Sequence, residues 1–306
     1  MLSLDRLSGV LIALASPLKR DGSVDEPAVG RLVEHVLAGG VHGLLPLGST
    51  GETAALDEPS RRQILRCVIE AAGGRVPVIC GIAQSNLPAA RTEIRAATDL
   101  GADAVLVAPP FYYPMAQSTV LEFYRQIAHE ARVPVLVYNI PQFTKVVIEA
   151  ETVATLAHER AIAGIKDSSR DFEYFEGVLL ATRDLPAFRV FTGSDTMLLP
   201  SLVMGGSGTI CGAGNVAPQW VVRIYNEFNA GDVDPARASQ DRLYELVAAL
   251  REGVFPLAIK AALHAQGICE PWSAAPVQAL SDAAQASLRK KLAEWGLLQE
   301  VGFVRS

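Results

Sequence analysis

A lysine at the end of an apolar run is the residue of this sequence with the clearest chemical potential. The run AIAGIK, residues 161–166, is typical of a short buried strand, and Lys166 is the only one of six lysines that ends such a run. Apolar surroundings favour the neutral amine, the form that attacks carbonyl carbon. Lys166 is therefore either a Schiff-base amine or a lysine whose charged head reaches solvent from a strand end.

The turn GSTGE, residues 48–52, follows another apolar run and carries two hydroxyl groups. Ser49 and Thr50, with unpaired backbone N–H groups in a turn that begins at Gly48, can hold a small carboxylate. The alternative is an ordinary turn in which Ser or Thr caps the following helix.

Tyr138 ends a third apolar run, and its hydroxyl can carry a proton. The alternative is a packing residue whose hydroxyl lies in water. A carboxylate-binding turn, a hydroxyl acid/base and a desolvated amine together fit one reaction, which is imine formation with a 2-oxo acid.

The elements that must position these residues are strands and helices in regular alternation. Eight βα units within about 230 residues predict a (β/α)8 TIM barrel, and the glycine fingerprint of an open doubly wound sheet is missing. The predicted strands are 9–15, 43–48, 77–82, 104–108, 134–139, 161–166, 189–192 and 207–211. The predicted helices are 26–38, 59–72, 87–100, 119–131, 149–158, 172–182, 196–204 and 218–229.

Strand alternation predicts the neighbours of the lysine. If Lys166 points into the barrel, Gly164 and Ile162 point there too, whereas Asp167 points away. Asp167 is thus a poor candidate for the proton-transfer partner of Lys166.

The alternation stops after residue 231, and 236–251, 255–266 and 280–296 are typical of three helices. We therefore predict a catalytic barrel over residues 1–230 and a small helical domain over residues 231–306. Active sites of such barrels lie at the carboxyl ends of the strands, where the three motifs above are expected.

Three further loops carry candidate residues. Asp195, in GSDT at 193–196, can recognise a polyhydroxylated substrate or cap the next helix. The aromatic loop PPFYYP at 109–114 can line the pocket or meet another subunit, and its exposed rings favour an interface. The GGSG stretch at 205–208 precedes a strand, so it is a tight turn at the end of the barrel away from ligands.

The composition argues against several kinds of partner and site. A net charge of −6 without any basic block disfavours nucleic acid and anionic membranes. The four dispersed cysteines predict reduced thiols of a cytoplasmic protein, and neither they nor the five histidines have metal-ligand spacing. We expect no leader peptide at the N-terminus and no apolar span of about 18 residues, hence a soluble protein.

Four motifs in this order resemble the family of dihydrodipicolinate synthase and N-acetylneuraminate lyase, which are class I pyruvate-dependent aldolases. They are GSTGE at 48–52, YNIP at 138–141, GIKDSS at 164–169 and GAGNVAP at 212–218. The resemblance covers nearly the whole chain. It implies a barrel with C-terminal helices, homodimers or homotetramers, and no metal or organic cofactor, because the imine itself is the electron sink.

The resemblance also implies roles for single residues. Lys166 matches the imine-forming lysine and Tyr138 the acid/base tyrosine. Ser49 and Thr50 match the pair that holds the pyruvyl carboxylate. Tyr112 resembles a tyrosine that a neighbouring subunit lends to the site through the Ser49 hydroxyl, and the tyrosine that follows it is the alternative.

Departures from the family motifs bear on the second substrate. The dihydrodipicolinate synthases carry an arginine two residues past the proline of YNIP, where this chain has Phe143, which disfavours an acidic aldehyde. The sialate lyases carry acidic and hydroxyl groups after strand seven and a serine after strand eight. This chain keeps Asp195 but has Thr196 and Gly212, which disfavours sialic acid.

We therefore expect a Schiff-base-forming aldolase or lyase acting on pyruvate or another 2-oxo acid plus an aldehyde. The leading substrate is a 2-keto-3-deoxy sugar acid or similar 4-hydroxy-2-oxo acid, with Asp195 and Thr196 near its hydroxyls. The alternatives are a 4-hydroxy-tetrahydrodipicolinate synthase that condenses pyruvate with aspartate semialdehyde, a 2-keto-3-deoxy acid dehydratase, and a non-catalytic 2-oxo acid binding protein.

Overall fold

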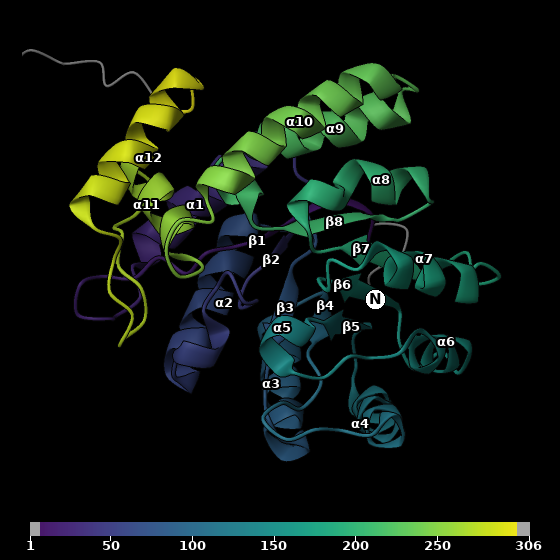
Figure 1. The fold of residues 1–306 in the computed structure, drawn as a ribbon. Coiled ribbons are helices and arrows are strands. Elements are labelled where there is room, and N and C mark those ends of the chain that lie inside the picture. The colour runs from purple at the N-terminus through teal and green to yellow at the C-terminus, as the bar shows by residue number, and fades with distance from the viewer. Residues whose placement is uncertain (1–6, 299–306) are drawn as a thin grey trace, which may run out of the picture.

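Eight parallel strands form a barrel in the computed structural model, which describes residues 7–298 (Figure 1). The strand order is β2-β1-β8-β7-β6-β5-β4-β3, and a parallel bridge between Leu44 and Val78 joins its two ends. The predicted (β/α)8 barrel is confirmed. The N-terminus, where we expected no leader, lies outside the described residues. The strands are β1 (Gly9–Ala13), β2 (Gly43–Leu45), β3 (Ile79–Ile82), β4 (Ala104–Val107), β5 (Val135–Asn139), β6 (Gly164–Asp167), β7 (Arg189–Thr192) and β8 (Gly208–Cys211).

Alternate side chains of the strands form two separate cores. On β1, for example, Leu11 belongs to the core inside the barrel, whereas Val10 and Ile12 belong to the larger core beneath the helices. The inner core is filled chiefly by Leu11, Leu45, Ile79, Leu106, Leu136, Tyr138, Phe191 and Ile210. Both faces of the sheet are therefore dry, which explains the nearly continuous apolar runs of the sequence.

Lys166 lies in the inner row, in register with Tyr138 on β5 and Phe191 on β7. The prediction that Ile162 shares this face is wrong, because Ile162 belongs to the outer core. The strand begins only at Gly164, so its alternation does not extend back to residue 162.

Helices surround the barrel and begin at capping residues. The side chains of Asp25, Asp57, Asn86 and Asp171 each accept a hydrogen bond from the N–H three residues later, which satisfies a free donor of the first turn. The short α5 was not predicted. The helices of the ring are α1 (Glu26–Ala38), α2 (Glu58–Ala72), α3 (Leu87–Leu100), α4 (Gln117–Glu130), α5 (Pro141–Thr144), α6 (Ala150–His158), α7 (Phe172–Ala181), α8 (Leu198–Val203) and α9 (Pro218–Asn229), with 3-10 turns η2 (Thr53–Ala55), η3 (Asp195–Met197) and η4 (Ala213–Asn215).

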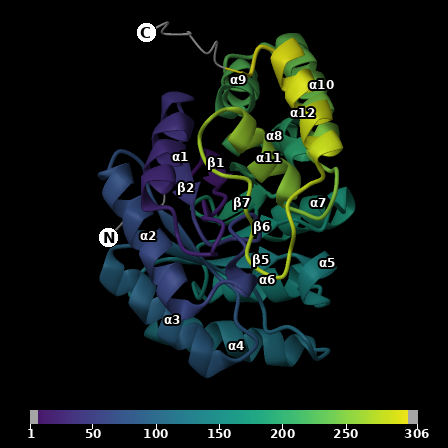
Figure 2. The same cartoon turned by 90° about the vertical axis from the view of Figure 1, so that its left-hand side faces the viewer.

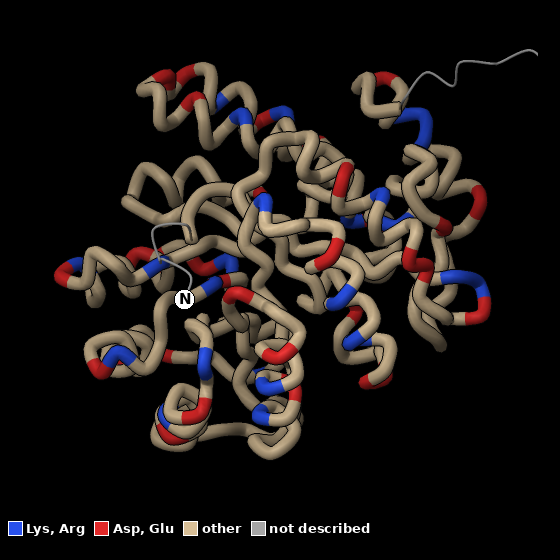
Figure 3. The backbone as a smooth tube through the Cα atoms, turned by 180° about the vertical axis from the view of Figure 1, so that it is seen from behind, with Lys and Arg blue, Asp and Glu red and all other residues tan. Residues whose placement is uncertain are grey.

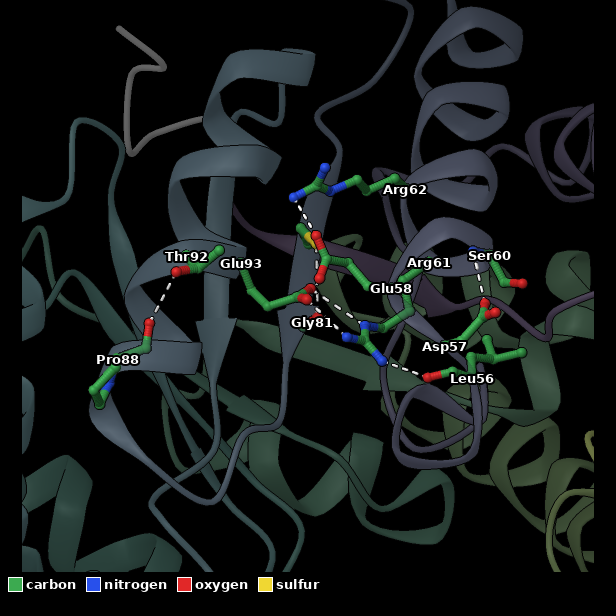
Figure 4. A network of polar contacts seen from close by, with 11 residues as sticks. Leu56, Asp57, Glu58, Ser60, Arg61, Arg62, Gly81, Pro88, Thr92 and Glu93 are labelled. Atoms are coloured by element: carbon green, nitrogen blue, oxygen red, sulfur yellow. Dashed lines mark hydrogen bonds and ion pairs between the residues drawn. The ribbon is translucent and has the colours of Figure 1, made fainter.

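Polar contacts link neighbouring helices of the ring. Arg61 on α2 pairs with Glu93 on α3 at 2.7 Å and also donates to the carbonyl of Leu56 (Figure 4). Acidic and basic residues are interleaved over the helices (Figure 3). The exposed pairs of the ring, such as Arg75–Glu34 and Arg125–Glu159, contribute about 1 kcal/mol or less each, so the ring is held chiefly by its apolar core.

Within the described part of the chain, three helices follow the barrel, namely α10 (Val233–Ala249), α11 (Leu257–Ala265) and α12 (Asp282–Glu294). The α10 helix packs along α9, where the Arg242 guanidinium lies 4.0 Å from the Trp220 ring (Figure 1). The segment between α11 and α12 crosses one end of the barrel (Figure 2). The division at residues 230/231 stays a prediction. Within residues 7–298, none of the helices has the length and apolar character of a membrane span.

Candidate active site

A cavity of about 410 Å³ opens at the carboxyl ends of the strands. Its walls include Ser49, Thr50, Tyr138 and Lys166, which come from the three strand ends that carry the chemical motifs. Other walls come from the loop between α10 and α11. The barrel and the C-terminal helices therefore build the cavity together.

Lys166 and Tyr138 lie side by side because β5 and β6 pair in register at these residues. The Lys166 Nζ is 3.4 Å from the Tyr138 hydroxyl, which is itself 3.2 Å from the Ser49 Oγ. Lys166 is only 4% exposed and Tyr138 6% exposed. Amine, phenol and serine hydroxyl form a chain along which a proton can move.

Asp167 forms its contacts with β5 and with the loop after β6, as strand alternation predicts. Its Oδ1 accepts from the Asn139 side-chain amide at 2.8 Å, and its Oδ2 accepts from the Ser169 hydroxyl at 2.9 Å. Burial raises the pKa of the Asp167 carboxyl, and the hydrogen bond from Asn139 opposes that shift. Asp167 therefore holds the strand that carries Lys166.

The turn after β2 keeps unpaired backbone donors beside the cavity. The N–H groups of Ser49 and Thr50 have no hydrogen-bond partner within residues 7–298, whereas those of Gly51 and Glu52 bond inside the turn at 3.1 and 3.2 Å. Two unpaired N–H groups next to two hydroxyls suit a carboxylate.

A buried ion pair fixes this turn to the C-terminal helices. The Glu52 carboxylate pairs with the Lys260 amine of α11 and accepts a hydrogen bond from the Ala274 N–H at 2.8 Å. Lys260 also donates to the Trp272 carbonyl at 2.6 Å. Burial lowers the pKa of Lys260, and the Glu52 charge opposes that shift. The pair thus positions the turn at residues 48–52 from outside the barrel.

We predict that Lys260→Met lowers the free energy of unfolding by about 3–5 kcal/mol, because the Glu52 charge would remain buried without a partner. The KM for the 2-oxo acid should rise as the turn loosens. Urea denaturation with steady-state kinetics measures both effects. The control is Lys290→Met in the exposed Lys290–Glu294 pair, which should change stability by no more than about 1 kcal/mol. Equal stability of both variants would contradict the prediction.

Asp195 lines the cavity and does not cap a helix. Its Oδ1 accepts from the Ala213 N–H at 2.8 Å, which joins the loops after β7 and β8. Burial raises the pKa of the Asp195 carboxyl, and the bond from Ala213 and the Lys166 charge act against that shift. Thr196 is not a wall residue because the chain turns into η3 here. Ser194, two residues earlier, is a wall residue instead, and its Oγ lies 3.2 Å from the Thr196 Oγ1.

Space for the amine depends on Gly193. A Cβ at this position would lie 2.8 Å from the Lys166 Cε and 2.0 Å from the Ser168 Oγ, both too short for real contacts. Any larger residue would displace Lys166.

The other predicted residues lie in different places. Phe143 is 55% exposed at the cavity wall, with its ring 6.4 Å from that of Phe255. Gly212 is also a wall residue, whereas Gly48 serves the turn without lining the cavity. Tyr112 is 82% exposed and does not line the cavity of its own chain.

Sequence reasoning missed two arginines of the cavity wall, Arg170 and Arg251. The cavity therefore has two guanidinium groups even though the residue two positions past Pro141 is not an arginine. Arg170 follows Lys166 in the loop after β6, and its place at the carboxyl end of a strand could have identified it as a candidate wall residue. Arg251 gave no such signal, because its approach depends on how the C-terminal helices pack. No group of three potential metal ligands occurs within the described residues.

Comparisons with known proteins agree with this architecture. The sequence profile of the Dihydrodipicolinate synthetase family matches residues 6–295. An uncharacterized DapA-like lyase of Halobacterium salinarum is 36% identical over 292 residues, 95% of each chain. The 4-hydroxy-tetrahydrodipicolinate synthase of Phenylobacterium zucineum is 36% identical over 290 residues, which cover 95% of this chain and 98% of that protein.

Solved structures give the same result. The dihydrodipicolinate synthase of Thermotoga maritima has a TM-score of 0.92 and 31% identity, with 95% of this chain and 99% of that chain covered. YagE, a prophage protein of the dihydrodipicolinic acid synthase family from E. coli K12 solved with pyruvate, has a TM-score of 0.91 and 28% identity, with the same coverage. The profile match, the relatives and the shared fold agree, and the chain belongs to the dihydrodipicolinate synthetase family.

Proposed function

We propose that this protein is a class I, pyruvate-dependent aldolase or lyase that cleaves or forms a 4-hydroxy-2-oxo acid, with a 2-keto-3-deoxy sugar acid as the leading substrate. The observation that carries the proposal is the 3.4 Å contact between the buried Lys166 amine and the Tyr138 hydroxyl. The unpaired N–H groups of Ser49 and Thr50 support a carboxylate beside that pair. The pyruvate found in the YagE structure supports the same pyruvyl half.

In this proposal the neutral Lys166 amine attacks the C2 carbonyl while Ser49 and Thr50 hold the C1 carboxylate. Loss of water gives a protonated imine, which can accept the electron pair of a breaking bond. Tyr138 takes the proton of the C4 hydroxyl, the C3–C4 bond breaks, and an aldehyde leaves. The enamine is protonated at C3 and hydrolysed, which releases pyruvate and restores the amine. Condensation is the same path reversed.

The imine is the electron sink, so this reaction uses no metal and no organic cofactor. The substrate side consists of pyruvate or a 2-oxo acid plus an aldehyde, and neither nucleic acid nor a membrane takes part. A cytoplasmic location is supported by the four cysteines, all of them buried and unpaired.

The substrate is tested by comparing kcat/KM for 2-keto-3-deoxy sugar acids with the rate of condensation of pyruvate and aspartate semialdehyde. We expect the sugar acids to be preferred. A preference for the semialdehyde would make the protein a synthase, release of water without an aldehyde would make it a dehydratase, and binding without turnover would make it a 2-oxo acid binding protein.

Tyr112 is proposed to reach the site of a neighbouring copy in a homodimer or homotetramer. Its backbone has φ 88, a conformation that is strained for a bulky residue, and its ring packs edge-on against Tyr113 with 5.0 Å between centroids. A monomeric dihydrodipicolinate synthase variant is among the structural neighbours, so assembly does not follow from the fold. Sedimentation of the wild type and of Tyr112→Phe, with their kcat, tests the proposal.

A further inference from the structure

Two arginines of the cavity wall have no partner. Arg170 follows β6, and Arg251 lies between α10 and α11. Both side chains are exposed, and neither guanidinium forms an ion pair or a hydrogen bond within residues 7–298. Some arginines of the outer ring do pair, as Arg75 does with Glu34 and Arg125 with Glu159, whereas exposed Arg160 is also unpaired within residues 7–298; what distinguishes Arg170 and Arg251 is their place in the cavity wall.

The cavity is basic although the chain is acidic. Apart from the reacting amine of Lys166, its walls within residues 7–298 carry two guanidinium groups, those of Arg170 and Arg251, and one carboxylate, that of Asp195, which is already bonded to the Ala213 N–H. The whole chain has a net charge of −6. Positive charge is thus concentrated where the substrate would enter, and such a field draws in anions.

The pyruvyl half of a substrate is bound by other groups than the Arg170 and Arg251 guanidiniums. In the proposed reaction its carboxylate is held by the turn at Ser49 and Thr50, and its C2 atom is bonded to Lys166. The two guanidinium groups therefore remain for a second anion. Arginine suits this task because its planar fork binds a carboxylate or a phosphate through two parallel hydrogen bonds.

We infer that the substrate carries a second anionic group, a carboxylate or a phosphate, at the end remote from the pyruvyl carboxylate, and that Arg170 and Arg251 bind it. This inference rests on the proposed function and defines its aldehyde half. Phe143 occupies the position where the synthases carry their arginine, and the cations here come from the end of β6 and from the C-terminal helices. An acidic aldehyde is therefore compatible with this chain, because Arg170 and Arg251 would bind its anionic group in place of the missing arginine.

Binding of uncleavable analogues tests the inference. Three 2-oxo acids of equal carbon chain that lack the C4 hydroxyl serve as probes, namely 2-oxohexanedioate, 6-hydroxy-2-oxohexanoate and the 6-phosphate of the latter. Calorimetry should show that at least one of the two anionic probes binds the wild type about ten- to a hundredfold more tightly than the hydroxyl probe. Which of the two binds more tightly identifies the anion.

Variants assign this preference to residues. Arg170→Gln and Arg251→Gln should each reduce it, and the double variant should remove it while binding the hydroxyl probe as the wild type does. The control is Arg160→Gln, since Arg160 is likewise exposed and has a similar backbone conformation to Arg170, with φ of 58° against 66°, but precedes β6 at the opposite end of the barrel. Equal affinity of all probes for the wild type, or an unchanged preference in the double variant, would overturn the inference.

Borohydride trapping of pyruvate on the same preparations separates this test from that of the proposed function. Adduct on Lys166 with no anion preference overturns only the anion site. Absence of the adduct overturns the imine mechanism whatever the probes show. Retention of the adduct in the double variant also verifies that this variant is folded.

Discussion

Lys166→Met is expected to reduce kcat by more than about 10⁴-fold, the scale of loss when an enzyme loses its nucleophile. Methionine has a similar length and fits the apolar row between Tyr138 and Phe191, so the fold should survive. Without the amine no imine forms, and the C3–C4 bond has no electron sink. Kinetics and a far-ultraviolet circular dichroism spectrum measure the two parts of the expectation.

Trapping gives the direct readout of the same change. Wild-type protein incubated with pyruvate and borohydride should yield carboxyethyl-lysine on the Lys166 peptide, and Lys166→Met should yield none. Lys145→Met is the matched control, because Lys145 lies on the surface after α5 and donates only to the Gln142 carbonyl. An adduct on any other lysine, or full turnover by Lys166→Met, would show that the imine mechanism is wrong.

Tyr138→Phe is expected to reduce kcat by about 10²- to 10⁴-fold, the range that general acid–base catalysis contributes. The phenyl ring keeps the packing of the inner core, while the link between the Lys166 amine and the Ser49 hydroxyl is lost. Imine formation needs proton transfer too, so trapping should become slower but reach the same extent. Adding borohydride at successive times after mixing with pyruvate separates the rate of adduct formation from its final extent.

Tyr124→Phe serves as the control for this substitution. Tyr124 is a buried tyrosine of α4 whose hydroxyl donates to the Val107 carbonyl at 2.8 Å, away from the cavity walls. Its loss should cost stability rather than catalysis. If both variants lose kcat equally, or if Tyr138→Phe keeps it, the assignment of Tyr138 as the acid/base group fails.

The sequence was sufficient for the barrel and for the convergence of the residues proposed to bind the pyruvyl group. Buried parallel strands appear in the sequence as apolar runs, so each strand end could be located to within about three residues. In a closed parallel barrel, residues at the carboxyl ends of the strands lie close together. Lys166, Tyr138, Ser49 and Thr50 accordingly line one cavity. Alternation failed at Ile162 because it holds only inside a strand.

The other half of the cavity could be predicted only in part: Phe143, Asp195 and Gly212 line it as predicted, whereas its remaining residues depend on tertiary packing. Arg251 and Phe255 reach the cavity only because α10 and α11 lie over the barrel end, a placement that no local pattern encodes. Ser194 rather than Thr196 lines the cavity because a 3-10 turn begins at Asp195, and a difference of two residues lies below the resolution of sequence patterns.

The Glu52–Lys260 pair also constrains how such an enzyme can acquire new substrates. Lys260 follows the loop that carries Arg251 and Phe255 by only a few residues along the chain, yet it anchors the turn that is proposed to bind pyruvate. Single substitutions in the loop can alter the choice of aldehyde while the anchor stays in place. Exchange of the whole C-terminal segment between relatives would alter both halves at once. In evolution and in engineering, point changes at residues 250–255 are therefore the accessible route to new specificity.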